Sequence, residues 1–199
     1  MKYKIIIILL IVNISSILAE SIQDSYALEA KGEYLKALKI MEKIVEKDNR
    51  NYFINLRCAY LSYLSYQFPK SEIYYQKAIL LAPDAIEPRL GQLKPLSALG
   101  KQVQLQVACK GILKLDPKNY TARSYIAYSL YTSGNYEEAE KYYASLIIDY
   151  PSDTEMLIGL GWTYVQLKDK KKAREILAIA NQITPADERI KNGLFYSKE

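Results

Sequence analysis

The stretch YTSGNYEEAEKYYASLIIDYP, residues 131–151, decides the fold. It carries five tyrosines, a glycine followed by Asn-Tyr-Glu-Glu-Ala, and a closing proline. Gly134 suits the end of one helix, because glycine readily takes the left-handed conformation just past a last turn. Pro151 suits the end of the next helix, since proline has no N–H to continue it. The stretch therefore predicts a helix that begins near Tyr136 and ends before Pro151.

This pattern recurs along the chain at a regular interval. Prolines at Pro83, Pro117, Pro151 and Pro185 follow each other at steps of 34. Residues 32–37, Gly-Glu-Tyr-Leu-Lys-Ala, resemble residues 134–139, which lie three such steps later. A period kept by several residue types at once indicates a repeat architecture.

Each period contains two apolar stripes with helical spacing. In residues 120–132, Ile126, Ala127 and Leu130 fall on one helix face. In residues 136–148, small and large apolar residues again share a face, with Ala139 allowing close approach of a partner helix. Each period is thus predicted to be an antiparallel helix pair.

These residues resemble the tetratricopeptide repeat family. The fifth period matches the family's signature positions with Leu157, Leu160, Gly161, Tyr164, Ala173, Leu177, Ala180 and Pro185. The resemblance implies an all-α, right-handed superhelical solenoid of antiparallel helix pairs over residues 20–187. The expected repeats are 18–51, 52–85, 86–119, 120–153 and 154–187, followed by a short capping helix or tail at 188–199. Repeat arrays need such a polar end to stay soluble.

The third repeat departs most from the family pattern. Pro95 falls inside its first helix, and Leu105 occupies a position that favours a small residue. A proline within a helix removes one hydrogen bond and clashes with the preceding turn. The second repeat has Tyr66 in place of the turn glycine, and the first has Asn49 in place of the closing proline. We expect the third repeat to be the weakest part of the array and a candidate hinge.

The first nineteen residues differ from the rest of the chain. Lys2 and Lys4 precede the apolar run IIIILLIV at residues 5–12, and small residues lead to Ala19. This is typical of a signal peptide, residues 1–19, cleaved after Ala19. The apolar run is shorter than the ~20 residues of a spanning helix, and an uncleaved membrane anchor is the alternative. We expect an extracytoplasmic protein, periplasmic or secreted.

Composition and motifs argue against an enzyme. The chain has no histidine, which removes the commonest general base and histidine-containing metal sites. Cys58 and Cys109 lack metal-ligand spacing and lie on apolar helix faces, so we expect two buried thiols that are not bonded to each other. No glycine-rich phosphate loop is present. Hence no catalytic residue, metal or cofactor is expected.

The charge balance argues against nucleic acid as a partner. Loss of Lys2 and Lys4 with the signal leaves 25 basic and 22 acidic residues, a net charge of +3. Proteins that bind nucleic acids usually carry a strong basic patch.

A second apolar stripe runs along the first helices, on a face that packing within each pair does not need. At steps of 34 it reads Tyr26, Tyr60, Lys94, Tyr128 and Trp162. The family resemblance implies that this stripe lines the concave surface where peptides lie. The predicted partner-binding residues are Tyr26, Leu56, Tyr60, Tyr63, Lys94, Tyr128, Tyr131, Ile158 and Trp162.

The sequence thus predicts an exported protein–protein interaction module, a scaffold, adaptor or assembly factor. Its partner would be a protein or peptide segment held in an aromatic groove. The family's Lys/Asn arrangement for a terminal carboxylate is absent, because Tyr26 and Tyr60 stand among the positions that would need polar groups. The alternative is a structural component that self-associates or assembles close to a membrane.

Overall fold

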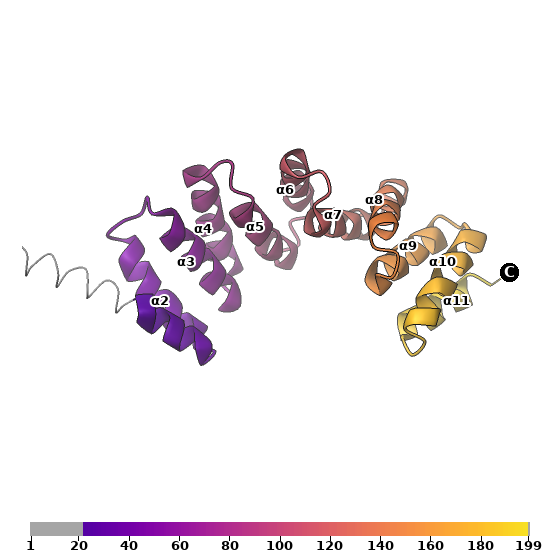
Figure 1. Cartoon of the computed structure of the whole chain (residues 1–199), viewed down its shortest axis with the longest axis horizontal. Coiled ribbons are helices and arrows are strands. Elements are labelled where there is room, and N and C mark those ends of the chain that lie inside the picture. The colour runs from indigo at the N-terminus through magenta and orange to yellow at the C-terminus, as the bar shows by residue number, and fades with distance from the viewer. Residues whose placement is uncertain (1–21, 199) are drawn as a thin grey trace, which may run out of the picture. The chain divides into compact units, whose positions relative to one another are not determined.

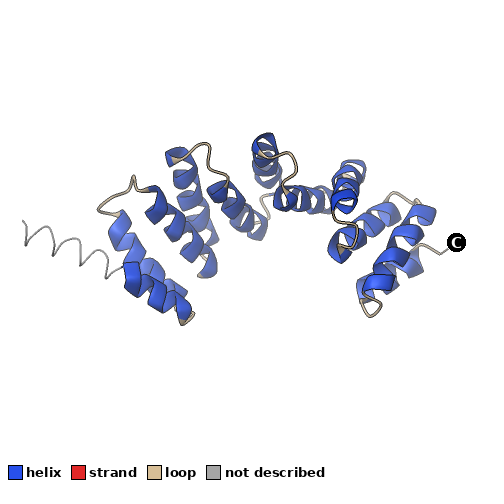
Figure 2. Ribbon diagram, viewed as in Figure 1, coloured by secondary structure: helices blue, strands red, loops and turns tan. Residues whose placement is uncertain are grey.

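The computed structural model describes residues 22–198, and every regular element in that range is an α-helix (Figure 2). After helical residues 22–30, the helices are α2 (Tyr34–Val45), α3 (Tyr52–Leu64), α4 (Phe68–Leu81), α5 (Glu87–Ala98), α6 (Gln102–Leu115), α7 (Tyr120–Thr132), α8 (Tyr136–Asp149), α9 (Thr154–Gln166), α10 (Lys170–Ile183) and α11 (Glu188–Tyr196) (Figure 1). The prediction of an all-α fold built from helix pairs is confirmed. The predicted signal, residues 1–19, lies outside the described residues.

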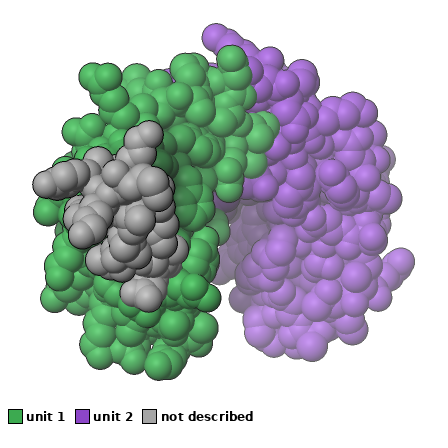
Figure 3. All heavy atoms as spheres, turned by 60° about the vertical axis from the view of Figure 1, so that its left-hand side comes forward, with its two compact units in different colours: residues 1–99 green, residues 100–199 purple. Residues whose placement is uncertain are grey.

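The chain divides into two compact units, residues 1–99 and 100–199 (Figure 3). In the first unit, α3 packs against α2 and α4, and α4 packs against α5. In the second unit, α7 packs against α6 and α8, and α9 packs against α8, α10 and α11. The boundary falls between the two helices of the predicted third repeat.

The turns inside the helix pairs share one backbone conformation. Positive φ angles occur at Gly32 (75°), Tyr66 (60°), Gly100 (66°), Gly134 (78°) and Lys168 (62°), one in each period of the repeat. A residue in the left-handed conformation ends one helix and lets the chain turn into the next. Glycine adopts this conformation at low cost, whereas a residue with a Cβ is strained in it. Tyr66 and Lys168 therefore hold a conformation that the repeat imposes on them.

Polar side chains define where most first helices begin. Asn51, Asn119, Asp153 and Asp187 each accept a hydrogen bond from a backbone N–H in the first turn of α3, α7, α9 and α11. Such caps satisfy donors that a helix start leaves without partners. Helix α5 has no side-chain cap at Ile86.

The core explains the tyrosines that keep the repeat period. Tyr75 and Tyr143 are 4% and 3% exposed, and burial raises the pKa of both phenols. Both are therefore packing residues of the repeat. Cys58 and Cys109 are free and fully buried, and burial raises the pKa of each thiol to about 12. These thiols are therefore protonated at neutral pH and pack as small apolar groups.

Helix α11 continues the array by one further first helix. Gly193 lies against Leu177 of α10, and Ile190 is fully buried. Phe195, one period after the buried Gly161, is 64% exposed.

In residues 22–198, no helix combines the length and the apolar character needed to cross a bilayer.

Candidate functional site

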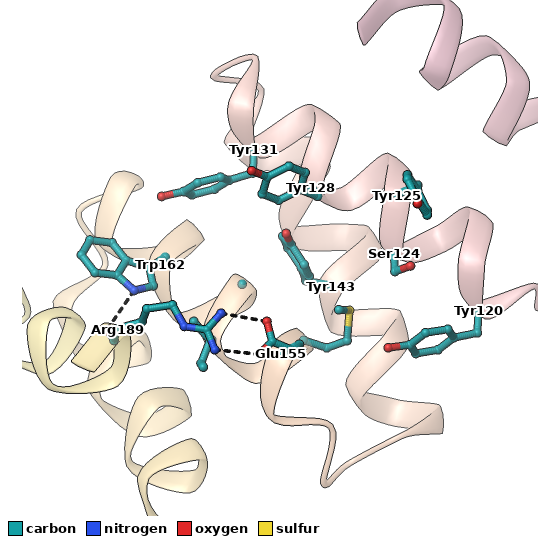
Figure 4. Close-up of a pocket in the computed structure, with 12 residues that line it drawn as sticks. Tyr120, Ser124, Tyr125, Tyr128, Tyr131, Tyr143, Glu155, Trp162 and Arg189 are labelled. Atoms are coloured by element: carbon teal, nitrogen blue, oxygen red, sulfur yellow. Dashed lines mark hydrogen bonds and ion pairs between the residues drawn. The ribbon is translucent and has the colours of Figure 1, made fainter. Parts of the chain in front are cut away.

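The second unit contains a cavity of about 670 Å³ lined mainly by aromatic side chains (Figure 4). Helices α7 and α9 supply its two walls, and α8 and α11 contribute one residue each. Its lining consists of Tyr120, Ser124, Tyr125, Tyr128, Tyr131, Tyr143, Glu155, Met156, Ile158, Gly159, Trp162 and Arg189. We call this cavity the aromatic groove.

Helical spacing produces the first wall. Tyr120, Ser124, Tyr128 and Tyr131 follow each other at intervals of four, four and three along α7, so they share one face. Tyr128 is 57% exposed, and the Tyr131 ring packs edge-on against Tyr136 at 5.6 Å between centroids. The wall therefore presents ring faces and hydroxyls together.

The second wall and the floor depend on a glycine. Trp162 and Gly159 lie on the same face of α9, and the Tyr143 ring of α8 reaches the backbone of Gly159. A Cβ at residue 159 would lie 2.4 Å from Cε1 of Tyr143, so a larger residue would displace the ring. Glycine at 159 thus allows Tyr143 to form the floor.

Helix α11 closes one end of the groove. The Trp162 indole Nε1 donates a hydrogen bond to the Arg189 carbonyl oxygen at 3.0 Å, and the ring contacts Tyr196 at 5.9 Å between centroids. The Arg189 guanidinium donates to both Glu155 carboxylate oxygens, at 2.8 and 2.7 Å, as drawn in Figure 4. This bidentate pair joins α11 to α9 beside the groove.

The charged groups at this end of the groove are paired, with two carboxylates against one guanidinium. Hydrogen bonds from Arg189 lower the pKa of Glu155, and the two carboxylates of Glu155 and Asp187 raise the pKa of Arg189. Burial raises the pKa of Tyr120 to about 12, together with the hydrogen bond that its hydroxyl donates to Asp153 at 2.6 Å. The groove therefore offers apolar surface with few uncommitted polar groups.

Four of the predicted partner-binding residues lie together in this groove: Tyr128, Tyr131, Ile158 and Trp162. Ile158 is only 5% exposed and belongs to a core cluster with Leu177, against which Trp162 also packs. The expectation that the core does not use this face is therefore wrong at Ile158 and Trp162. The cause is α11, which packs on α9 and brings both side chains into contact with the core.

The other five predicted residues lie in the first unit: Tyr26, Leu56, Tyr60, Tyr63 and Lys94. Tyr26 is 47% exposed, and the Arg57 guanidinium stacks on its ring at 3.5 Å from the centroid. Arg57 also pairs with Glu29 at 2.6 Å. The Lys94 ammonium lies 5.7 Å from the Tyr63 ring centroid. This face carries more charge than the aromatic groove.

Sequence reasoning missed Tyr196 and Arg189. Tyr196 follows Trp162 by one period and extends the same series onto α11, where it is 61% exposed. Arg189 follows Glu155 by the same step. Continuing the period into the tail would have found both positions, whereas the pairing of Arg189 with Glu155 needed the structure.

One family model matches part of the second unit. The tetratricopeptide repeat family model matches residues 130–194, which include the α9 wall and the floor of the groove but only Tyr131 of the α7 wall. No curated protein matches the chain.

Solved structures of tetratricopeptide repeat type resemble the chain in fold. YrrB, described as a TPR protein with an unusual peptide-binding site, aligns with a TM-score of 0.75 and 18% identity over 86% of this chain and 89% of YrrB. A MamA structure aligns with a TM-score of 0.78 and 13% identity over 84% of this chain and 92% of MamA. TTC0263 of Thermus thermophilus aligns with a TM-score of 0.58 and 14% identity over 90% of this chain and 97% of TTC0263. The family model thus matches part of the second unit, and the chain has the fold of these tetratricopeptide repeat structures.

Proposed function

We propose that this protein is a protein-interaction module that holds a peptide segment of a partner in the aromatic groove. The supporting observation is the cavity of about 670 Å³ between α7 and α9, lined by tyrosines and the Trp162 ring. Ligand sites are typically apolar cavities of roughly 300–1,000 Å³ with a few polar groups for orientation. The peptide-binding site of YrrB, a protein of the same fold, also favours this function.

The chemistry of the lining suits binding rather than turnover. Tyrosine and tryptophan bury much area with few rotors to freeze, and such residues dominate binding energy at interfaces. The chain has no histidine, and the carboxylate of Glu155 is held by Arg189. We therefore expect a partner to be bound and released unchanged.

We further propose that the module acts outside the cytoplasm. The motivation is the sequence pattern of Lys2, Lys4 and the apolar run at residues 5–12. Sequencing the N-terminus of the exported protein should start near Glu20. Recovery of Met1 on membrane-bound protein would instead indicate an anchor.

The groove can be tested with a displayed library of random twelve-residue peptides, selected on the immobilised full chain. Tyr128→Ala is the informative variant, because Tyr128 is 57% exposed in the groove and can be truncated without opening the core. A binding anchor is worth about 2 kcal/mol or more, so affinity should fall about thirtyfold, with a nearly unchanged melting temperature. Ile148→Ala is the matched control, since Ile148 is 80% exposed on α8 and does not line the groove.

Trp162→Ala is the less informative choice. Trp162 holds α11 through the Arg189 carbonyl and packs against the core, so its removal should lower both stability and binding. If the Tyr128→Ala variant and the native chain bind the selected peptides equally well, the proposal that peptides bind in the aromatic groove is wrong. If no peptide is selected and particle size grows with protein concentration, the self-associating structural role replaces the proposal.

A further inference from the structure

We propose that the aromatic groove takes an arginine side chain of the bound segment, with its guanidinium on the ring of Tyr128. This inference rests on the proposed function and names the class of partner, a segment that carries arginine. It starts from the first unit, where an arginine of the protein itself covers the aromatic ring at the equivalent position of the repeat.

The first unit shows how this repeat holds a guanidinium. The Arg57 guanidinium of α3 lies 3.5 Å from the centroid of the Tyr26 ring. It donates hydrogen bonds to the Glu29 carboxylate at 2.6 Å and to the Ser25 hydroxyl at 3.4 Å. Arg57 is only 7% exposed, so its charge is held between an aromatic ring and a carboxylate and largely away from water. The attraction of a cation to a ring face is strongest in such a desolvated place.

The equivalent place in the aromatic groove is open. Tyr128 lies three periods of 34 residues after Tyr26, and Gly159 lies three periods after Arg57. Gly159 has no side chain to cover the tyrosine ring. The Tyr143 ring takes the space next to the Gly159 backbone, and above this floor lies the cavity of about 670 Å³. The groove therefore has room for a ligand side chain where the first unit has its own arginine.

The charges beside the groove favour a cationic ligand. Arg189 pairs with two carboxylates, Glu155 at 2.7 Å and Asp187 at 2.6 Å, so negative charge is in excess in this cluster. Asp153 adds a further carboxylate, which accepts the hydrogen bond of the Tyr120 hydroxyl at 2.6 Å. A guanidinium that enters the groove can therefore share a carboxylate with Arg189, and opposite charges favour its entry.

The counter-charge comes from a different helix than in the first unit. Tyr131 lies three periods after Glu29, so α7 has a phenol where helical residues 22–30 have a carboxylate. Glu155 on α9 lines the same cavity as Tyr128, and Figure 4 shows the Tyr143 ring between these two side chains. A guanidinium on the Tyr128 ring would thus face the Glu155 carboxylate across the floor of the groove.

Arginine suits this place better than lysine. A guanidinium is planar and weakly hydrated, so it stacks on aromatic faces, whereas an ammonium is a strongly hydrated point charge. The first unit contains both kinds of contact. Arg57 approaches the Tyr26 centroid to 3.5 Å, but the Lys94 ammonium lies 5.7 Å from the Tyr63 centroid. We therefore expect the groove to distinguish the two basic side chains.

Peptide selection on the immobilised full chain tests the class of ligand. Peptides recovered from the random twelve-residue library should be enriched in arginine relative to lysine. The tightest of them is then synthesised with capped ends in three forms, with its arginine kept, replaced by lysine or replaced by citrulline, which keeps the shape without the charge. The single tryptophan of the chain lies in the groove, so its fluorescence reports binding. The arginine form should bind about fivefold more tightly than the citrulline form, or better, with the lysine form between them.

Variants that keep the fluorescent reporter test the two groups assigned to the guanidinium. Tyr128→Ala should remove most of the difference between the arginine and citrulline forms, whereas Tyr128→Phe, which keeps the ring, should retain it. Glu155→Gln should weaken the arginine form more than the citrulline form. Ile148→Ala, on an exposed site outside the groove, should leave both affinities unchanged. Melting temperatures close to that of the native chain would exclude unfolding as the cause.

Failure of this inference and failure of the proposed function give different results. If the recovered peptides carry no arginine, or the citrulline form binds as tightly, while Tyr128→Ala still weakens binding, the groove binds peptides but the arginine assignment is wrong. A preference for arginine that survives Tyr128→Ala would also overturn the assignment. If no library peptide is recovered, or Tyr128→Ala leaves every affinity unchanged, both are wrong.

Discussion

The Tyr143 ring lies on the backbone of Gly159, where a Cβ would come within 2.4 Å of Cε1. The same relationship joins Tyr75 and Gly91, both two periods earlier, with a Cβ at Gly91 only 2.3 Å from the Tyr75 ring. In both cases a second helix places a tyrosine against the first helix of the following repeat. At Gly159 this contact also forms the floor of the aromatic groove.

Gly159→Ala should destabilise the protein although alanine favours helices. Alanine gains about 1 kcal/mol in helix propensity, but an overpacked contact costs about 1–3 kcal/mol, and the buried Tyr143 ring has little room to move. We expect a net loss of about 1 kcal/mol in the free energy of unfolding, together with weaker peptide capture. Urea unfolding measures the change in the free energy of unfolding. Gln104→Ala at an exposed site of α6 is the control, and a Gly159→Ala protein as stable as this control would contradict the packing argument.

Relieving the strained turns should stabilise the protein. Tyr66 and Lys168 occupy left-handed backbone at positions where the other turns have glycine. Left-handed backbone costs roughly 1–2 kcal/mol for a residue with a Cβ, so Lys168→Gly should raise the free energy of unfolding by about 1 kcal/mol. Thermal melts can show this, with Gly134→Ala expected to shift the melting temperature in the opposite direction. A lower melting temperature for Lys168→Gly would mean that the flexibility of glycine in the unfolded chain outweighs the strain.

Acid should loosen α11 before it unfolds the protein. Arg189 lowers the pKa of Glu155 below its ordinary value of 4.5, so this pair stabilises the folded state above pH 4.5 and loses that contribution as the pH falls through the folded pKa. Both side chains are more than half exposed, so the effect should be small. Fluorescence of Trp162, which donates to the Arg189 carbonyl, should change over this pH range. Arg189 also lowers the pKa of Asp187, so Glu155→Gln should reduce the transition and leave the part due to Asp187. A transition of the same size in that variant would assign it to a group other than Glu155.

Hydrogen exchange should be fastest, among the first helices of the last three repeats, in α5. Pro95 lies inside α5 and donates no N–H, and this helix has no side-chain cap, whereas α7 and α9 are capped by Asn119 and Asp153. Local and nearest-neighbour terms dominate repeat stability, so these deficits should appear between Pro88 and Leu99. Amide hydrogen exchange followed by mass spectrometry measures the protection of α5 relative to α7 and α9. Equal protection in all three helices would mean that burial of Pro95 and the contact of Tyr75 with Gly91 compensate.

Local signals in the sequence were sufficient for the fold. Where a helix begins and ends depends on nearby residues such as Gly134 and Pro151. Because these residues recur at steps of 34, the same helix pair is formed again in each period. The predicted helix at residues 120–132 is found as Tyr120–Thr132, and the one at residues 136–148 as Tyr136–Asp149. Because each repeat contacts mainly its neighbours, few long-range choices remain for the tertiary structure.

The sequence by itself determined the helix pairs, the aromatic series along the first helices and the place of Tyr128 and Trp162 in it. Only the tertiary structure decided which members of that series surround a cavity, because a cavity needs two helix faces brought together. It also decided that Ile158 is buried and that Trp162 supports α11, since both follow from packing of the C-terminal helix on α9. The ion pair in the lining depends in the same way on the contact between Arg189 and Glu155, side chains far apart in the sequence that only packing of α11 on α9 brings together.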